Sequence, residues 1–514
     1  MPPMFEVLGK TIHVKSPLTL KDLGTYPIAE KNEIDQWLHE AEVAFEHWRR
    51  SRIQDRTKYI LGVRDELYRR LEQAIDLISE TTGKPRTEAL TAEVIPMLDF
   101  IAYFVKRAPH ILKDRRIFLH LFMHKKSQFI YEPLGPVVIL APWNYPLSIA
   151  LAEVVLALLA GNTVLLKMSE AALPIGQFIE SLFSAVALPK GVLNLVKGNE
   201  QTVTTLLASP KIKKIVFTGS TGVGKKILSQ SVENLTPCLL ELGGKDAAIV
   251  RDDANILKAA RGIVWGAFTN AGQVCASIQR VYVHRKIIQP FVEAVVSETQ
   301  KLRLGEDVGA ITLPGQLNRY QYQLEAALKA GAKILTGGNS EIKNGAQFFQ
   351  PTVLINVKED MAIMKEETFG PFLPIQMVDS DEEAIRYVND SIYALCASIW
   401  TRHIKEAKRM ARDIHVGTVT INDVIYTHAL PETPWGGYKM TGIGRVHAEI
   451  GLKEYVQIKH INYDLIPLTP FWWFPYTKHS YETALALARF LATKPIRKKT
   501  RAFFEFVSHY LFKR

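Results

Sequence analysis

The chain has 514 residues, of which 47% are apolar and 22% are charged, a composition typical of a soluble globular protein with two or three domains. Its net charge of +11 is concentrated at the C-terminal end, where residues 465–514 carry nine Lys or Arg and only two Glu. Because the excess of basic residues is concentrated in a short tail without a recognition module, we expect no nucleic acid partner.

The opening residues, MPPMFEVLGKTIHVKSP, lack the apolar core of a signal peptide, and the region from residue 34 onward is predicted to be helical. From residue 34 to 77 apolar side chains recur every three or four positions, as in amphipathic helices, and the helical pattern continues to about Lys113. In RIFLHLFMHKKSQFIYEP, residues 116–133, two short runs of β-formers flank the polar HKKSQ, which predicts a β-hairpin that turns there.

After Pro133 the pattern changes to short apolar strands that alternate with helices. The most apolar stretch, residues 147–160, carries Glu153, which suits a buried helix and not a bilayer crossing. The first predicted strands are GPVVILAP, NTVLLKM, KKIVFTG, AAIVRD and RVYVH, and a second region, residues 244–445, adds PTVLINV, PFLPIQMV, LCASIWT and GTVTIND. Such strands predict parallel sheets covered on both faces, here in two α/β domains in series.

Three cysteines, Cys238, Cys275 and Cys396, form neither a disulfide framework nor a metal-ligand spacing. We therefore expect a reducing, cytoplasmic compartment and no metal site. Cys238 and Cys396 lie inside apolar runs, where a buried cysteine acts as a small apolar residue. Cys275, in the Gly-containing polar turn NAGQVCASIQR before a strand, is placed like a nucleophile, although the motif alone also allows a core residue.

Two polar residues at predicted strand ends could assist a thiolate. Glu241 in LELGGK ends a strand before two glycines, and Asn144 in PWNYP follows the strand VVILAP. Residues beyond the carboxyl ends of parallel strands face the crevice where such sheets bind ligands. Each alone is usually a solvated turn or an Asx-turn, but with Cys275 they provide a base and an amide donor.

The stretch VFTGSTGVGKK, residues 216–226, almost matches the phosphate-binding loop of nucleoside triphosphatases. It fails at its last position, because Lys226 stands where that loop needs a Ser or Thr hydroxyl for magnesium. A turn that only packs a helix on a sheet is the simpler interpretation of the motif alone.

Together these motifs resemble the aldehyde dehydrogenase superfamily over residues 30–460. APWNYP, LLKMSE, FTGSTGVG, LELGGKD, NAGQVC, EETFGP and PWGGYKMTGIGR occur in the family's order, at close to its spacing. The resemblance implies an aldehyde dehydrogenase-like α/β fold with a Rossmann-type cofactor domain, an α/β catalytic domain and a β-hairpin oligomerisation element.

The resemblance also implies a dinucleotide site. In the family the turn at Gly219 and Ser220 opens a helix whose N-terminus meets the pyrophosphate of a dinucleotide, a task suited to its free N–H groups and dipole. Lys167 and Glu170 are expected to hold the adenosine ribose, and the carboxylate of Glu170 favours NAD, with NADP possible. The remaining expected cofactor-binding residues are Trp143, Glu367 and Phe369, the last two toward the nicotinamide end.

The mechanism implied by the resemblance is aldehyde oxidation through a thioester. The Cys275 thiolate attacks the aldehyde, the Asn144 amide and the Cys275 backbone N–H hold the oxyanion, hydride leaves for the nicotinamide, and Glu241 activates the hydrolytic water. Acylating relatives, which pass the thioester to coenzyme A, generally lack this Glu. Several hydrolytic relatives have an acid directly after the GxGR arginine, where this chain has Val446, so a proton relay through that position is not expected.

Four parts of the chain are predicted. The dinucleotide-binding domain comprises residues 1–113 and 134–243, and the catalytic domain residues 244–445. Residues 114–133 and 446–464 form the oligomerisation element, whose strand EYVQIKHINY would otherwise be a lone edge, so we expect a homodimer or homotetramer. Residues 465–514 form a basic, aromatic tail.

The tail and its flanking motifs point to an apolar aldehyde as the small-molecule substrate. INDVIYTHALPETPWGG, GRVHAEIGLKEY and WWFPY resemble the branch with carotenoid-dialdehyde dehydrogenases. In the tail, FWWFPY, one amphipathic helix at YETALALARFLA and the basic KPIRKKTR suit peripheral contact with an anionic membrane; packing at a subunit interface and disorder are the alternatives. The alternative functions are a catalytically silent binding or structural protein and a membrane-recruited scaffold.

Overall fold

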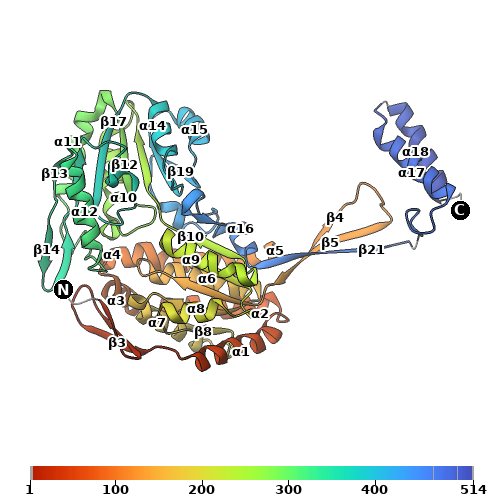
Figure 1. The fold of residues 1–514 in the computed structure, drawn as a ribbon, viewed down its shortest axis with the longest axis horizontal. Coiled ribbons are helices and arrows are strands. Elements are labelled where there is room, and N and C mark those ends of the chain that lie inside the picture. The colour runs from red at the N-terminus through yellow and green to blue at the C-terminus, as the bar shows by residue number, and fades with distance from the viewer. Residues whose placement is uncertain (1–3, 467, 495, 512–514) are drawn as a thin grey trace. The chain divides into compact units, whose positions relative to one another are not determined.

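The computed structural model describes residues 4–466, 468–494 and 496–511 (Figure 1). The chain forms two compact units: unit 1 comprises Met1–Lys113 and Tyr131–Gln457, and unit 2 comprises Asp114–Ile130 and Ile458–Arg514. The predicted division of unit 1 into a cofactor and a catalytic domain at residue 243 stays a prediction.

A six-stranded sheet, ordered β20-β10-β9-β6-β7-β8, organises one half of unit 1. Its strands are β6 (Pro136–Ala141), β7 (Thr163–Met168), β8 (Leu193–Leu195), β9 (Lys214–Thr218), β10 (Cys238–Glu241) and β20 (Gly442–Ile443). All neighbours are parallel except β10 and β20. Val137 and Ile139 enter one hydrophobic core while Val138 and Leu140 enter another, so the predicted coverage of both faces is confirmed.

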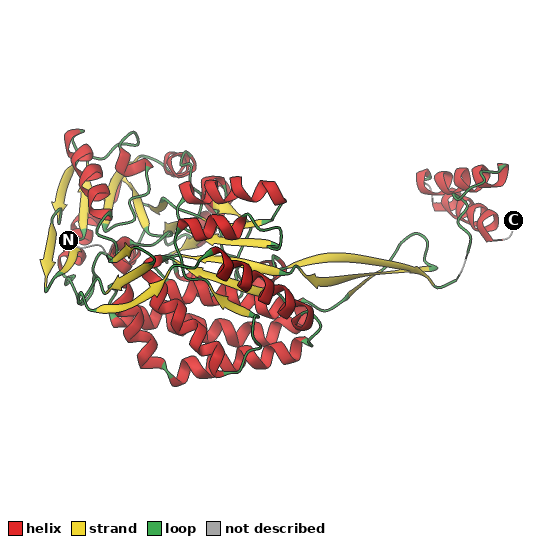
Figure 2. Cartoon of the chain, turned by 60° about the horizontal axis from the view of Figure 1, so that its bottom comes forward, coloured by secondary structure: helices red, strands yellow, loops and turns green. Residues whose placement is uncertain are grey.

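Two groups of helices provide these cores (Figure 2). The first group is α2 (Ile53–Arg69), α3 (Leu71–Thr82), α5 (Ile95–Ile111), α6 (Pro146–Ala160) and α7 (Leu173–Ala185). The second group is α1 (Lys31–Trp48), α8 (Glu200–Leu207) and α9 (Thr221–Ser231). Helix α6 is buried along nearly its whole length, which explains why its sequence shows no polar face.

A seven-stranded sheet, ordered β13-β16-β17-β12-β11-β18-β19, organises the other half. Its strands are β11 (Asp246–Val250), β12 (Ile278–His284), β13 (Lys333–Thr336), β16 (Thr352–Ile355), β17 (Phe372–Val378), β18 (Cys396–Trp400) and β19 (Thr418–Ile421). One core contains α10 (Ile256–Phe268) and α11 (Ile288–Gln300), and the other contains α12 (Gln316–Lys329), α14 (Asp381–Asn389) and α15 (Ile404–Asp413). Only β13 runs antiparallel to its neighbour.

Smaller elements complete unit 1. They are β1 (Phe5–Leu8), β2 (Thr11–Lys15), β3 (Asp22–Pro27), α4 (Arg86–Ala89), the π-helical turn η1 (Leu90–Val94), β14 (Ser340–Lys343), β15 (Ala346–Phe349), α13 (Ala362–Lys365) and α16 (Ala448–Lys453). The N-terminal sheet β1-β2-β3 and the β14-β15 pair were not predicted from the sequence.

Unit 2 contains a small sheet and a pair of helices. The sheet, ordered β21-β5-β4, is built from β4 (Arg115–Ile117), β5 (Lys125–Pro133) and β21 (Val456–Asp464), the last two crossing into unit 1. The helices are α17 (Lys478–Ala492) and α18 (Ile496–Leu511), with Ala486, Ala502 and Phe506 buried. Among the residues that the structure describes, no helix combines the length and the hydropathy needed to cross a membrane.

The predicted turn of the hairpin was wrong. HKKSQ was expected to form the turn, but Lys125 begins β5, and the connection from β4 is residues 118–124 instead. This connection is apolar yet exposed, with Phe118 100% and Met123 75% exposed. Because most side chains of this sheet are at least partly exposed, apolar character does not separate strand from turn here.

Candidate functional site

Seven of the ten predicted site residues lie at the carboxyl ends of four neighbouring strands of the six-stranded sheet. Trp143 and Asn144 follow β6, Glu170 follows β7, Ser220 follows β9, and Glu241 is the last residue of β10. Lys167 and Gly219 lie at the ends of β7 and β9. Since these strands are parallel, their carboxyl ends form a single edge, the usual position of a ligand site in such sheets.

The Asn144 loop is short because prolines bound it. Pro142 ends β6, and Pro146 starts α6, where a missing N–H has no cost. The Asn144 side chain is buried, and its Nδ2 donates to the carbonyl oxygen of Gln273 at 3.0 Å. This hydrogen bond joins the loop after β6 to the loop that carries Cys275.

The Cys275 loop is conformationally unusual. After α10 the chain makes a tight turn in which Asn270, Ala271 and Gly272 have left-handed φ values of 50°, 54° and 71°. Such a run costs energy for the alanine and is typical of functional sites. Cys275 itself is half-buried, and a Cβ at Gly244 would lie 2.2 Å from its carbonyl oxygen, so only glycine fits beside it.

Burial controls the protonation of both the thiol and the carboxyl. Desolvation raises the pKa of the Cys275 thiol, and the charges of Asp246, Glu241 and Glu367 raise it further. Desolvation also raises the pKa of Glu241 well above its usual range, with repulsion from Glu153 adding to it and Arg445 opposing it. A carboxyl with a raised pKa is suited to accept and release protons near neutrality.

A buried polar network, which the sequence interpretation missed, surrounds the Asn144 loop. Lys84 Nζ donates to Glu93 Oε1 at 2.7 Å and to the carbonyl oxygen of Asn144 at 2.8 Å. Glu88 accepts from the Thr269 hydroxyl at 2.9 Å and from the Asn270 N–H at 2.9 Å. In the sequence Lys84, Glu88 and Glu93 stand in TGKPRTEALTAEV, which has the pattern of an ordinary polar helix start; only the structure reveals that Lys84 and Glu93 are buried.

A pocket of about 180 Å³ has Cys275 among its lining residues. Its wall is aromatic and aliphatic, and no charged side chain lines it among the described residues. The larger lining side chains are Tyr145, Ile149, Trp265, Tyr426, His428 and Trp435. Burial lowers the pKa of His428 to about 4, so this ring is neutral at pH 7 and stacks edge-on against Trp435 at 4.9 Å between ring centroids.

The start of α9 has the features of a dinucleotide site. Ser220 is the N-cap, with its hydroxyl accepting from the Val223 N–H at 3.4 Å, and nothing lies within 4 Å of a Cβ built on Gly222. The helix N-terminus therefore has free N–H groups and room for a close approach. At the end of the neighbouring β7, Lys167 Nζ donates to Glu170 Oε1 at 2.7 Å.

The residues expected near the nicotinamide lie against the loop after β10. Glu367 Oε1 accepts from the Gly244 N–H at 3.0 Å, and desolvation raises the pKa of this carboxyl. The Trp143 and Phe369 rings meet edge to face, with centroids 5.5 Å apart. Phe369 has a φ of 55°, and its carbonyl oxygen accepts from the Tyr320 hydroxyl at 2.6 Å.

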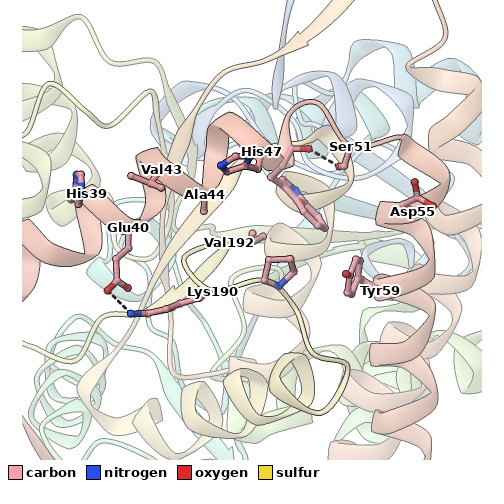
Figure 3. A pocket seen from close by; sticks show the side chains of 12 residues that line it. His39, Glu40, Val43, Ala44, His47, Ser51, Asp55, Tyr59, Lys190 and Val192 are labelled. Atoms are coloured by element: carbon pink, nitrogen blue, oxygen red, sulfur yellow. Dashed lines mark hydrogen bonds and ion pairs between the residues drawn. The ribbon is translucent and has the colours of Figure 1, made fainter.

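Figure 3 shows a different pocket, of about 650 Å³, between α1, the start of α2 and the segment before β8. It contains none of the predicted site residues. Its charged pair, Lys190 and Glu40 at 2.8 Å, is an ordinary ion pair. Within the described residues no group of three or more His, Cys, Asp or Glu is arranged to hold a metal ion.

Comparison with known proteins agrees with this geometry. The model of the aldehyde dehydrogenase family matches residues 6–461. The chain is 37% identical over 481 residues to a 4,4'-diapolycopene aldehyde oxidase of Methylomonas sp, covering 92% of this chain and 89% of that protein. It is 33% identical to the betaine aldehyde dehydrogenase of Bacillus subtilis (strain 168), covering 89% and 95%. The aldehyde dehydrogenase of Mycobacterium tuberculosis complexed with NAD+ superposes with a TM-score of 0.84 at 31% identity, covering 90% of this chain and 95% of that one. The chain therefore belongs to the aldehyde dehydrogenase family.

Proposed function

We propose that this aldehyde dehydrogenase oxidises an apolar aldehyde to the carboxylic acid, with Cys275 as the nucleophile and NAD as the hydride acceptor. The observation that carries the proposal is the uncharged, largely aromatic pocket that Cys275 helps to line. Binding in such a pocket lowers the free energy of an apolar substrate. A charged substrate would lose its hydration there without finding a charged side chain to pair with.

The first half of the reaction forms a covalent adduct. The Cys275 thiol loses its proton to solvent, and its sulfur bonds to the aldehyde carbon. The resulting alkoxide is held by the second N–H of the Asn144 amide and by the Cys275 backbone N–H. The bond between Asn144 and Gln273 fixes the amide orientation in advance.

The second half releases the acid. A bound nicotinamide dinucleotide supplies the hydride acceptor that turns the adduct into a thioester. Glu241 then removes a proton from water, the hydroxide adds to the thioester carbon, and the Cys275 sulfur leaves as the thiolate. The raised pKa of Glu241 favours a proton-accepting role for this carboxyl near neutrality.

The described residues fit this cofactor. The N-terminus of α9, with Ser220 as its cap, would hold the pyrophosphate, and Lys167 and Glu170 would hold the adenosine ribose. The carboxylate of Glu170 would repel a 2′-phosphate, which supports NAD over NADP. Glu367 and Phe369 would hold the nicotinamide end, against Trp143.

Unit 2 supports two proposals about partners. β21 is an outer strand whose Ile458 is 60% exposed, so we propose that it joins another subunit of a homo-oligomer. Trp473, Phe474 and Phe504 are 61%, 82% and 65% exposed, and the sequence of the tail is basic, so we propose that the helix pair contacts an anionic membrane surface. An enzyme at that surface would meet an apolar aldehyde where it is most concentrated.

The test is NADH formation at 340 nm with linear aldehydes of increasing chain length, comparing the unaltered protein and Cys275→Ala. We expect kcat/KM to rise with chain length, by up to about fourfold per buried methylene, and to vanish in Cys275→Ala. Each added methylene buries more apolar surface in the pocket wall.

Absence of turnover with NAD or NADP on every aldehyde would overturn the proposal in favour of a catalytically silent binding protein. A preference for charged or short aldehydes would overturn the apolar substrate alone. Binding of NAD without turnover, measured by calorimetry, would separate a silent protein from one that is not folded.

A further inference from the structure

We propose that Lys84 and Glu93 are positioning residues for the oxyanion amide: their buried ion pair fixes the loop that carries Asn144. The proposal rests on the oxyanion role of Asn144 in the proposed function. Neither residue belongs to the motifs at the strand ends, and neither touches Cys275 in the described contacts.

The pair holds Asn144 from two sides. Lys84 Nζ donates to the Asn144 carbonyl oxygen at 2.8 Å and lies 3.8 Å from the centre of the Tyr145 ring. Glu93 Oε2 accepts from the N–H groups of Leu147 and Ser148 at 2.8 and 3.2 Å, capping the start of α6. The loop is therefore fixed at its carbonyl and at the helix that follows it.

The charges have no alternative partner in solvent. Both side chains are fully buried, with 0% of either exposed, and they lie 2.7 Å apart. A buried pair of this kind is expensive to desolvate, and well-packed apolar residues would often give equal stability. Since stability alone does not require it, the specific hydrogen bonds that the pair makes to the Asn144 loop provide a reason for its presence.

The same helical segment also holds the other loop of the site. Glu88, five residues before Glu93, accepts from Thr269 and Asn270 in the turn that leads to Cys275. In a regular α-helix side chains five apart point about 140° away from each other. The π-helical turn Leu90–Val94, with the Ile95 N–H bonded to the Leu90 carbonyl, reduces that divergence, so both carboxyls reach the site.

The two loops are also joined directly. Asn270 Nδ2 donates to the Asn144 carbonyl oxygen at 3.1 Å, beside the Lys84 ammonium, and Asn144 Nδ2 donates to Gln273 at 3.0 Å. A shift of the Asn144 carbonyl would therefore move the amide relative to Cys275. Misplacement by about 1 Å can cost about a hundredfold in rate.

The experiment is a double-mutant cycle read by the pre-steady-state NADH burst with a linear aldehyde. Its single variants are Glu93→Gln and Asn144→Ala, and the fourth corner combines them. We expect Glu93→Gln to slow the burst at least tenfold in the unaltered background and less than twofold in the Asn144→Ala background, because its effect acts through that amide. The rate at which iodoacetamide alkylates Cys275, a reaction that forms no oxyanion, should differ less than twofold between Glu93→Gln and the unaltered protein.

Breaking a buried pair can unfold a protein, so a paired variant, Lys84→Met with Glu93→Gln, removes both charges together. We expect its thermal midpoint to recover toward that of the unaltered protein while its burst stays slow. If the pair had only a structural role, the paired variant would recover both the thermal midpoint and the burst rate of the unaltered protein.

Three results would overturn the proposal: multiplicative effects in the cycle, an alkylation rate that falls in parallel with the burst, or a paired variant as fast as the unaltered protein. If the unaltered protein itself forms no NADH but binds NAD, the proposed function fails, and the catalytic role of the pair fails with it.

Discussion

At the scale of single residues, the site combines a thiol and a carboxyl whose protonation depends on the same burial. Desolvation raises the pKa of both Cys275 and Glu241, and the charge of Glu241 raises the pKa of the thiol further. The base form of Glu241 is the carboxylate, so its population grows as pH rises through that raised pKa. Hydrolysis of the thioester should then accelerate with pH.

This dependence gives a prediction for Glu241→Gln. We expect the burst of NADH to persist, because Asn144 and Cys275 are unchanged, while steady-state turnover falls by about 100-fold or more, in the range of general-base catalysis. The rise of turnover with pH should also disappear, since glutamine has no carboxylate to form. Stopped-flow absorbance at 340 nm from pH 5.5 to 9 measures both quantities.

Asn144→Ala is the matched control, because it should slow the burst itself, which Glu241→Gln should leave in place. If Glu241→Gln abolishes the burst too, Glu241 is required before hydride transfer and the assignment to hydrolysis alone is wrong. An unchanged pH profile in the variant would show that another group accepts the proton.

Residues at strand ends could be predicted from the sequence, whereas the residues that support them could not. Asn144 and Glu241 follow apolar runs bounded by Pro or Gly, which marks the carboxyl end of a strand. Lys84 and Glu93 lie in a stretch whose polar pattern suits a surface helix. Lys84 is buried against Asn144 and Glu93 against the start of α6, both far away along the chain. Local pattern carries no information on such a contact.

At the scale of elements, helix α9 contains two glycines with opposite surroundings: Gly224 is crowded and Gly222 is open. A Cβ at Gly224 would lie 2.5 Å from Leu242 Cδ2, whereas a Cβ at Gly222 would meet nothing within 4 Å. The first glycine allows the helix to approach the sheet, and the second leaves open space at the helix N-terminus.

We therefore expect opposite effects of the same substitution on stability. Gly224→Ala should lower the free energy of unfolding by about 1–3 kcal/mol through overpacking, and Gly222→Ala should raise it by up to about 1 kcal/mol through helix propensity. Urea denaturation without added cofactor measures both, and a shift of the same sign in the two variants would contradict the packing explanation. Calorimetry with NAD should show weaker binding by Gly222→Ala, because its methyl group occupies the open space.

Elements were predictable where both faces of a sheet are buried, and not where a sheet is exposed. The continuous apolar runs of β6, β7 and β9 identified strands correctly. In β5, Lys125 and Lys126 are part of a strand although they read as a turn, because few side chains of that sheet are buried. The burial of α6 likewise matches the prediction from its apolar sequence.

At the scale of the whole molecule, unit 2 should decide whether the protein associates with membranes. We expect the full-length protein to co-sediment with vesicles of anionic phospholipid and not with neutral phosphatidylcholine vesicles, and binding to weaken as salt increases. A chain ending at residue 464, which lacks the tail after β21, should stay in the supernatant with both.

Trp473→Ser with Phe474→Ser in the full-length chain separates aromatic insertion from charge, because it leaves every basic residue in place. Weaker binding of this variant supports insertion. Equal sedimentation of the full-length and shortened proteins would contradict membrane contact and leave subunit packing as the role of the tail.

The burial of the Lys84–Glu93 pair has a consequence for the ionic conditions under which the site keeps its geometry. Exposed pairs such as Lys10–Glu30, with 82% and 51% of the side chains exposed, are weakened when dissolved ions gather around them. No dissolved ion can enter between two side chains that are completely enclosed. The alignment of the Asn144 loop is therefore insensitive to ionic strength, even where contacts at the protein's basic tail are not.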